Sequence, residues 1–475
     1  MAAADLPAGR PGNLTAEEEE KLRRLWALVL RVLAVDDATP AGQEATVSNA
    51  PSEQTTTAHL EKGKKKRTLF SRKNNGASSC NSQSQSASSV IDPSSLIEGD
   101  ADDKYGQTQQ FHEALSNMSP DSIRETLWSM VKHDDPDALL LRFLRARKWD
   151  VEKALVMLIS TMNWRATEMH VDDDIMKNGE GGAAEAEKGH DGPDKVLGHE
   201  FLDQMRMGKS FLHGTDKAGR PICFVRVRLH RQGDHSEEAL ERHTVFVIET
   251  CRMLLKPPID TATIIFDMTG FSMANMDYTP VKFMVKCFEA NYPESLGTVL
   301  IYKAPWIFQG IWKIIRGWLD PVVASKVHFL NNSKDMEAFV DLKGLPREID
   351  GYEDWEYRYE EPVEGENAKM ADTATRDRLL DARRQLIEEY ERETLDWVKG
   401  DTGHAAARKE SRNATAARLR ENYWEVDPYI RARSVYDRIG MIKPGGGLDF
   451  YATTNGTPGK GAPKSAAGTT PDDVD

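Results

Sequence analysis

The side chains that could carry out catalysis or hold a metal are scattered along this chain of 475 residues. No glycine-rich phosphate loop and no G-x-S-x-G nucleophile turn follows any predicted strand. The 12 histidines do not pair at the H-x-x-x-H spacing of metal ligands. The four cysteines form no C-x-x-C pair, which indicates reduced thiols rather than disulfides or a zinc site: Cys80, Cys223, Cys251 and Cys287. We therefore expect no enzymatic activity, no metal and no cofactor.

One carboxylate stands where an α/β enzyme would carry an active-site residue. Asp267 lies at the end of the predicted buried strand 261–268, and open α/β sheets bind ligands beyond the carboxyl ends of their strands. Thr269 and Gly270 follow it, however, and a carboxylate in that context more often accepts hydrogen bonds from the backbone of a turn. We therefore interpret Asp267 as a turn-forming residue.

A tryptophan-rich segment is the most unusual feature of the sequence. Residues 304–321 contain three Trp, four Ile and one Phe in a span that predicts a helix. These residues would cover most of the helix circumference, so a second face must be buried or meet lipid. A core helix is the alternative, but Lys313 and Arg316 lie inside the run, and long cationic side chains can reach water from a bilayer surface. We predict a lid that touches a membrane through Trp306, Ile307, Phe308, Ile311, Trp312, Ile315 and Trp318.

Overall charge and hydropathy argue against two further classes. Lys and Arg total 62 against 76 for Asp and Glu, and the resulting net charge of −14 argues against a whole-molecule nucleic-acid binder. No apolar run approaches the roughly 20 residues of a spanning helix, and residues 1–10 lack the pattern of a secretion signal. The basic run 62–67 is interpreted as solvated charge, with acidic-lipid binding or a nuclear signal as alternatives. We expect a cytoplasmic protein.

The elements that must position these side chains follow from composition and periodicity. Thr15 and Glu18 can form a capping box for an amphipathic helix, whose acidic first turn favours docking on the main body over a membrane surface. Strand-like and helix-like stretches then alternate in a pattern that predicts parallel strands joined by crossover helices. We divide the chain into an N-terminal helix at 14–35, a disordered linker at 36–104, a helical lobe at 105–170, a disordered insertion at 171–195, an α/β domain at 196–355, a C-terminal helical extension at 370–440 and a disordered tail at 441–475.

Three stretches resemble a known family. Leu140–Asp150 reads L-L-R-F-L-R-A-R-K-W-D, and Tyr292–Gly297 reads Y-P-E-S-L-G ahead of a predicted strand. Trp318–Val327 reads W-L-D-P-V-V-A-S-K-V and leads into the last predicted strand. In this order they resemble the CRAL-TRIO lipid-binding family, specifically fungal phosphatidylinositol transfer proteins of the CSR type. The resemblance covers residues 105–355, about half of the chain.

The resemblance implies a fold and a set of binding residues. It implies an α/β CRAL-TRIO fold, in which a helical N-terminal lobe precedes a mostly parallel sheet flanked by helices. A gate helix, here Pro305–Leu319, would close an apolar pocket. The family's headgroup-binding positions map onto Glu294, Lys326, Arg142, Arg147 and Lys148. Cationic donors suit a buried phosphate, and a carboxylate accepts hydrogen bonds from inositol hydroxyls. Without the resemblance, a plain ion pair and a solvated helix face would explain the same residues.

The resemblance also implies a function. A gate helix that opens at a bilayer would exchange bound phosphatidylinositol for a second lipid between membranes, with the phospholipid as cargo rather than cofactor. The family's usual Thr, three residues before Lys326, is Val323 here, which leaves a sterol or squalene-like cargo as an alternative. A regulator that presents its lipid to a lipid kinase is a second alternative, and an enzyme acting on lipid is a third. We expect a lipid and a peripherally, transiently contacted membrane surface as partners, and no nucleic acid.

Overall fold

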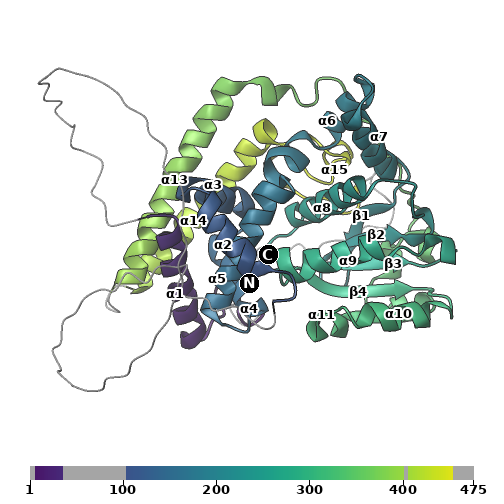
Figure 1. Cartoon of the computed structure of the whole chain (residues 1–475), viewed down its shortest axis with the longest axis horizontal. Helices are drawn as coiled ribbons and strands as arrows, with labels where there is room; N and C mark the ends of the chain where they lie inside the picture. The colour runs from purple at the N-terminus through teal and green to yellow at the C-terminus, as the bar shows by residue number, and fades with distance from the viewer. Residues whose placement is uncertain (1–5, 36–102, 401–404, 453–475) are drawn as a thin grey trace, which may run out of the picture. The chain divides into compact units, whose positions relative to one another are not determined.

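The computed structural model describes residues 6–35, 103–400 and 405–452. Five helices of this part of the chain form a helical lobe (Figure 1): α1 (Ala16–Val32), α2 (Gln107–Asn117), α3 (Pro120–Val131), α4 (Pro136–Ala146) and α5 (Val151–Asn163). The predicted capping box is confirmed, since Glu18 N donates to Thr15 Oγ1 over 3.2 Å and Thr15 N donates to Glu18 Oε2 over 2.8 Å. Trp26 of α1 is fully buried. The N-terminal helix therefore docks on the main body, as predicted.

A five-stranded sheet forms the second lobe. Its strands lie in chain order: β1 (Ser210–Thr215), β2 (Pro221–Arg226), β3 (Ala262–Asp267), β4 (Leu296–Tyr302) and β5 (Val327–Leu330). Strands β2 to β5 pair in parallel, as the alternation of strands and helices predicted. The antiparallel edge strand β1, joined to β2 by a short turn, was not predicted. The sheet is mostly parallel.

Alternate residues of the buried strands serve two different cores. Ile264 packs with α8 (Glu237–Met253) and α10 (Phe308–Arg316) on one face, whereas its neighbour Ile265 packs with residues 336–349 on the other. This follows from the two-residue period of a strand, and burial of both faces explains the continuous apolar run in β3. Two further helices complete the first face: α9 (Tyr278–Lys286) and α11 (Pro321–Ser325).

Residues 171–195 correct our prediction, because they form structure instead of a disordered insertion. Within and beyond this range lie two packed helices, α6 (Met176–Lys188) and α7 (Pro193–Arg206). The helices approach closely at Gly198, where a Cβ would lie 2.7 Å from the carbonyl oxygen of Ala183. Glu180 of α6 is fully buried and accepts hydrogen bonds from Val435 N and Tyr359 Oη. The polar composition of the segment predicted disorder. That prediction was wrong because the partners that make burial of Glu180 favourable lie far away in the sequence.

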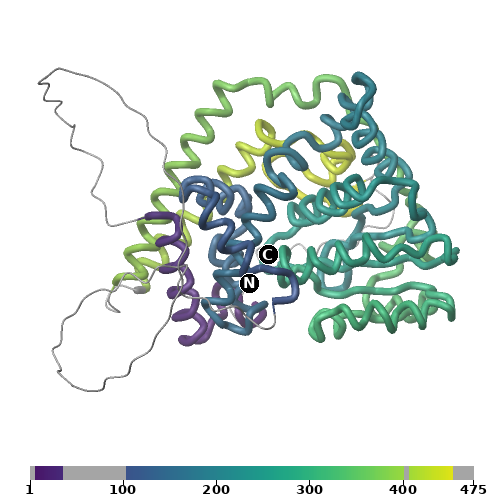
Figure 2. The backbone as a smooth tube through the Cα atoms, viewed as in Figure 1, coloured from purple at the N-terminus to yellow at the C-terminus, as the bar shows by residue number. Residues whose placement is uncertain are grey.

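The C-terminal region contains α13 (Thr373–Lys399), α14 (Ala405–Ile430) and α15 (Val435–Arg438). In Figure 2 its yellow chain runs from the helical lobe back to the sheet. The described part of the predicted disordered tail, 441–452, is ordered, which corrects that prediction. The Phe450 carbonyl accepts a hydrogen bond from Gly214 N at 2.8 Å, and Tyr436 Oη accepts one from Leu212 N at 2.9 Å. The tail segment is ordered because it covers the edge strand β1.

The predicted linker lies almost entirely outside the described residues, as do residues 453–475, the basic run 62–67 and Cys80. Its last two positions are described and correct the boundary. Asp103 accepts hydrogen bonds from the backbone of Gln107 at 2.7 Å and Thr108 at 2.8 Å, at the start of α2. The helices within the described ranges include none that is long and apolar enough to cross a bilayer.

Candidate functional site

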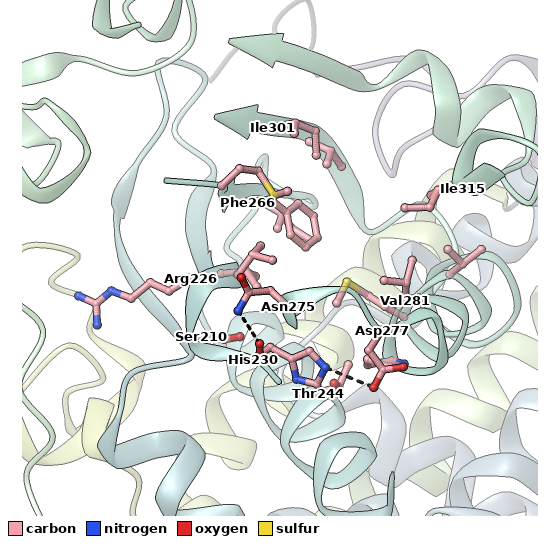
Figure 3. A pocket seen from close by; sticks show the side chains of 18 of the residues that line it. Ser210, Arg226, His230, Thr244, Phe266, Asn275, Asp277, Val281, Ile301 and Ile315 are labelled. Carbon is pink, nitrogen blue, oxygen red and sulfur yellow. Dashed lines mark hydrogen bonds and ion pairs between the residues drawn. The ribbon is translucent and has the colours of Figure 1, made fainter. Parts of the chain in front are cut away.

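An apolar cavity of about 220 Å³ lies between the sheet and three helices, α8, α9 and α10. Figure 3 shows its lining, in which Phe266 and Ile301 come from the sheet, Val281 from α9 and Ile315 from α10. Parallel strands place these side chains on one face, and α10 covers them. The tryptophan-rich helix is therefore the cover of an apolar hollow.

The apolar residues of α10 and its approach lie on two faces, one inward and one outward, in agreement with the expectation that they cover most of the helix circumference. Phe308, Trp312 and Ile315 line the cavity. The side chain of Trp306 is 86% exposed, and Ile307 and Ile314 are also exposed, at 38% and 48%. Lys313 and Arg316 lie in the exposed part as well. The outward face therefore combines apolar and cationic side chains.

Only part of the predicted membrane-contacting set is on that outward face. Phe308, Ile311 and Ile315 are buried, so they do not reach a bilayer in this conformation. Trp318 packs on Tyr278 with ring centroids 5.3 Å apart. The surface available for lipid contact is therefore centred on Trp306.

A polar cleft of about 1180 Å³ lies between the helical lobe and the sheet lobe. Four of the five predicted headgroup residues line it: Glu294, Lys326, Arg147 and Lys148. Lys326 Nζ lies 4.0 Å from Glu294 Oε2 and donates to the carbonyl oxygen of Leu296 over 2.8 Å. The structure thus brings the Y-P-E and S-K elements together at one edge of the cleft.

The fifth predicted residue, Arg142, is not among the residues that line the cleft. Its Nη1 donates a hydrogen bond to the backbone carbonyl of Glu294 over 2.9 Å, and its side chain is buried. Glu294 has φ of 53°, in the left-handed region that non-glycine residues seldom adopt. Arg142 therefore holds the backbone of Glu294 and does not line the cleft, while its predicted contact with a ligand stays a prediction.

Three further basic residues of the cleft were missed by the sequence reasoning: Lys104, Arg145 and Lys153. Lys104 Nζ lies 2.7 Å from Glu289 Oε2, a carboxylate that also accepts from Tyr105 Oη at 2.6 Å. Arg145 lies in the same basic stretch as Arg142, but sequence spacing does not show which of the two reaches the cleft. Burial, reinforced by its neighbours Arg10 and Arg142, lowers the pKa of Arg145 to about 10. The cleft is therefore lined by six basic and six acidic side chains, so it is highly polar without a large excess of either charge.

Local sequence explains how the basic residues are presented. Asp135 begins α4 by accepting hydrogen bonds from Asp137 N at 2.9 Å and Ala138 N at 3.1 Å. Asp150 begins α5 by accepting from Lys153 N at 3.0 Å. The short connection between the two helices contains Lys148 with φ of 51°. Two capped helices thus project a tight basic turn into the cleft.

The polar cleft and the apolar cavity adjoin each other. Four residues line both: Phe288, Leu296, Leu319 and Val323. Val323, the position that departs from the family pattern, therefore lies at the junction between polar and apolar surroundings. This geometry suits a molecule with a charged end and an apolar body.

Asp267 and the cysteines show no catalytic arrangement. Asp267 Oδ1 accepts from Thr269 N at 3.0 Å and its Oδ2 accepts from Arg228 Nη1 at 2.8 Å, which confirms the predicted turn-forming role. Cys223, Cys251 and Cys287 are free and buried, and burial raises their pKa values. Over the described ranges, no group of three or more His, Cys, Asp or Glu side chains is arranged to hold a metal.

Comparison with known proteins assigns the family. The CRAL/TRIO N-terminal domain matches residues 107–160, and the CRAL/TRIO domain matches residues 205–351. A CRAL-TRIO domain-containing protein of Schizosaccharomyces pombe is 40% identical over 449 residues, which cover 92% of this chain and 93% of that protein. The chain belongs to the CRAL-TRIO family. The helical lobe and mostly parallel sheet are therefore a CRAL-TRIO fold, as the three sequence stretches predicted.

Two relatives of this CRAL-TRIO protein are named for lipid transfer. Phosphatidylinositol transfer protein CSR1 of Eremothecium gossypii is 36% identical, over 92% of this chain and 98% of that protein. Phosphatidylinositol/phosphatidylcholine transfer protein SFH7 of Arabidopsis thaliana is 30% identical, over 45% of this chain and 39% of that protein. The protein in the crystal structure of Sfh5 is 18% identical in sequence, and its fold matches with a TM-score of 0.37. The match covers 55% of this chain and 91% of that chain.

Proposed function

We propose that this CRAL-TRIO protein binds phosphatidylinositol and exchanges it, and a second lipid, between membranes. The observation that carries the proposal is that the polar cleft adjoins the apolar cavity, with four residues lining both. A phospholipid needs both compartments, because its headgroup is costly to bury without donors and its acyl chains are costly to leave in water. The 36% identity to phosphatidylinositol transfer protein CSR1, over nearly the full length of both chains, supports the choice of cargo.

The headgroup is placed in the polar cleft. Lys326, Arg147 and Lys148 supply donors for the phosphate oxygens, and the carboxylate of Glu294 accepts from inositol hydroxyls. Arg145, Lys104 and Lys153 add positive charge to the cleft. Burial and the nearby arginines lower the pKa of Arg145, so this cleft gains stabilisation from an anion.

Exchange takes place at a bilayer surface, with α10 as the gate. Each CH₂ group of an acyl chain costs about 0.8 kcal/mol to expose to water, so a lipid leaves a membrane quickly only if another apolar surface receives it. The exposed Trp306, Ile307 and Ile314 supply that contact, while Lys313 and Arg316 attract anionic lipid. The protein then acts from the cytoplasm, binds the membrane surface peripherally and transiently, and needs no covalent chemistry.

One observation favours an alternative cargo. Val323 offers no hydroxyl at the junction of cleft and cavity, so a sterol or squalene-like molecule would lose no hydrogen bond there. A second alternative is that the bound lipid is presented to a lipid kinase without net transport. Measuring kinase stimulation and transfer with the same protein preparation distinguishes these, because presentation requires stimulation without bilayer-to-bilayer movement.

The direct test is transfer of labelled phosphatidylinositol between donor and acceptor vesicles. The double variant Glu294→Ala with Lys326→Ala should lose most transfer, because it removes both ends of the headgroup contact. The matched control is Lys334→Ala with Glu337→Ala, an exposed pair outside the cleft. Undiminished transfer by the first variant, with both proteins folded, would reject the assignment of the headgroup site.

A further inference from the structure

The inner end of the apolar cavity contains a buried cation without a carboxylate partner. Lys209 is only 7% exposed and lines the cavity. Its Nζ makes one long hydrogen bond, 3.5 Å, to Gln204 Oε1. Among residues 6–35, 103–400 and 405–452, no carboxylate oxygen forms a salt bridge with it. Buried lysines are normally paired with a carboxylate, so this ammonium, with one long hydrogen bond to an amide oxygen, has donor capacity left over.

A second unpartnered polar side chain lines the same cavity. His243 of α8 is 3% exposed, and neither Nδ1 nor Nε2 has a hydrogen-bond partner among the described residues. Burial, together with nearby Lys209, lowers the pKa of His243 to about 3. Its imidazole is therefore neutral and offers one N–H donor and one acceptor nitrogen. Buried polar groups of this kind are rarely left unsatisfied.

The other polar groups nearby are already engaged. Figure 3 shows His230 pointing to Asp277, with 3.3 Å between Nε2 and Oδ2, and Asn275 Nδ2 donates to the carbonyl oxygen of His230 over 2.9 Å. Asp277 also accepts from Thr279 N at 3.0 Å. Asp203 is paired with His235 at 2.9 Å. The unused hydrogen-bonding capacity is thus dominated by the Lys209 ammonium and the His243 N–H.

The size of the cavity limits its occupant. Its volume of about 220 Å³ is somewhat larger than the roughly 150 Å³ cavity that accommodates benzene. Such a space encloses a small polar end and the adjoining part of one hydrocarbon chain, so the rest of a long chain extends to the lining that the cavity shares with the polar cleft. A carboxylate matches this end, because its two oxygens can accept from both donors and its single charge balances one lysine.

We propose that the inner end of the cavity binds the carboxylate of a long-chain fatty acid, with Lys209 and His243 as its donors. The inference shares with the proposed function only the apolar cavity, and it does not require a lipid headgroup in the polar cleft. Burial lowers the pKa of Lys209 to about 8, against the opposing effect of Asp234, Asp203 and Asp277, and a bound carboxylate would raise this pKa again by favouring the charged ammonium.

The test compares oleate with oleyl alcohol as competitors of a fluorescent fatty acid bound to the full chain. We expect oleate to bind at least roughly tenfold more tightly than the alcohol, since only the carboxylate engages the lysine. Lys209→Met and His243→Leu should reduce this preference, whereas Lys343→Met, at an exposed lysine outside the cavity, should preserve it. If Lys209 had a purely structural role, its replacement would destabilise the fold. We expect instead that Lys209→Met leaves the thermal stability equal or higher, because the substitution removes a buried charge that has no carboxylate partner.

Three results would overturn the inference. The first is equal binding of oleate and oleyl alcohol, and the second is an unchanged preference for oleate in Lys209→Met. The third is tighter competition by lysophosphatidic acid than by oleate, because that result would assign the site to a lipid phosphate.

The double variant Glu294→Ala with Lys326→Ala separates the two proposals. It should lose phosphatidylinositol transfer and retain the oleate preference. Absence of phosphatidylinositol transfer by the unmodified chain, with the oleate preference intact, rejects only the proposed function.

Discussion

Arg142 Nη1 donates a hydrogen bond to the backbone carbonyl of Glu294 over 2.9 Å, across 152 positions of the sequence. The contact joins α4 of the helical lobe to the turn that carries the Glu294 carboxylate, which we propose as a headgroup ligand. It also stabilises Glu294 in a left-handed backbone conformation with φ of 53°. Arg142 is thus a positioning residue for a site that it does not line.

Arg142→Met should weaken phosphatidylinositol binding through Glu294. Loss of a charge-assisted hydrogen bond costs about 1.5 kcal/mol, which corresponds to roughly tenfold in affinity. Binding of an apolar cargo without an inositol headgroup should not change, and this comparison separates positioning from a general loss of structure. Arg347→Met, at a guanidinium whose side chain is 64% exposed, serves as the control. Equal losses for both cargoes would contradict the positioning role.

Trp306 and Trp312 should have separable roles. Trp306→Ala removes a side chain that is 86% exposed, so the midpoint of thermal unfolding should not shift. Binding to vesicles should weaken by about 2 kcal/mol, or roughly thirtyfold, from the lost apolar contact. Trp312→Ala, which alters the cavity wall, should instead reduce cargo binding in solution. Vesicle co-sedimentation and cargo titration measure the two effects, and a reversed pattern would refute the assigned faces.

Val323→Thr should shift cargo preference toward phosphatidylinositol. The substitution replaces a methyl group by a hydroxyl of similar size where the cleft meets the cavity. One net hydrogen bond contributes about 1 kcal/mol, which corresponds to roughly fivefold in affinity. Competition between phosphatidylinositol and squalene on the same protein measures the shift. An unchanged ratio would show that this position does not contact the headgroup.

Glu180→Ala should destabilise the protein strongly. The change removes one of the two carboxylate partners of Arg438, leaving it with Glu366, and it leaves Val435 N without an acceptor. Breaking a buried ion pair of this kind lowers the free energy of unfolding by about 3 kcal/mol. Glu185→Ala, at an exposed position of the same helix, should change it little. Similar urea midpoints for the two variants would mean that the C-terminal segment is not anchored through Glu180.

Stability should decrease as the pH falls below about 6.5. Burial lowers the pKa of His133 to about 4 and that of His243 to about 3, so between these values and 6.5 the unfolded chain binds protons that the folded chain does not. Each histidine then reduces the free energy of unfolding by about 1.4 kcal/mol per pH unit. Urea unfolding at pH 7, 6 and 5 tests this, since His243→Gln should have a shallower dependence. Parallel curves for variant and parent would contradict the assignment.

Much of the fold was predictable because its signals are local. The capping box at Thr15 and Glu18 and the parallel strands both follow from short-range spacing and were found in the structure. The insertion containing Glu180 was predicted wrongly for the complementary reason. Its composition is that of a solvated segment, and only partners more than 170 positions away make burial of its carboxylate favourable.

The candidate site was predictable in part. The Y-P-E and S-K motifs marked Glu294 and Lys326, which lie 4.0 Å apart. The basic stretch of α4 was recognised, but Arg142 and Arg145 lie three residues apart on neighbouring positions of one helix, and only the opposing lobe decides which faces the cleft. Lys104 was assigned to the linker because its contact with Glu289 joins distant parts of the chain.

The sequence by itself determined the family, the alternation of strands and helices, and the presence of a tryptophan-rich cover, because motifs and periodicity are properties of neighbouring residues. Only the tertiary structure decided which face of α10 looks inward, that Val323 lies at the junction of two compartments, that Lys209 is buried without a carboxylate partner and that His243 is buried without a hydrogen-bond partner among the described residues. Burial and pairing depend on which distant segments meet, and that is settled by packing of the whole chain.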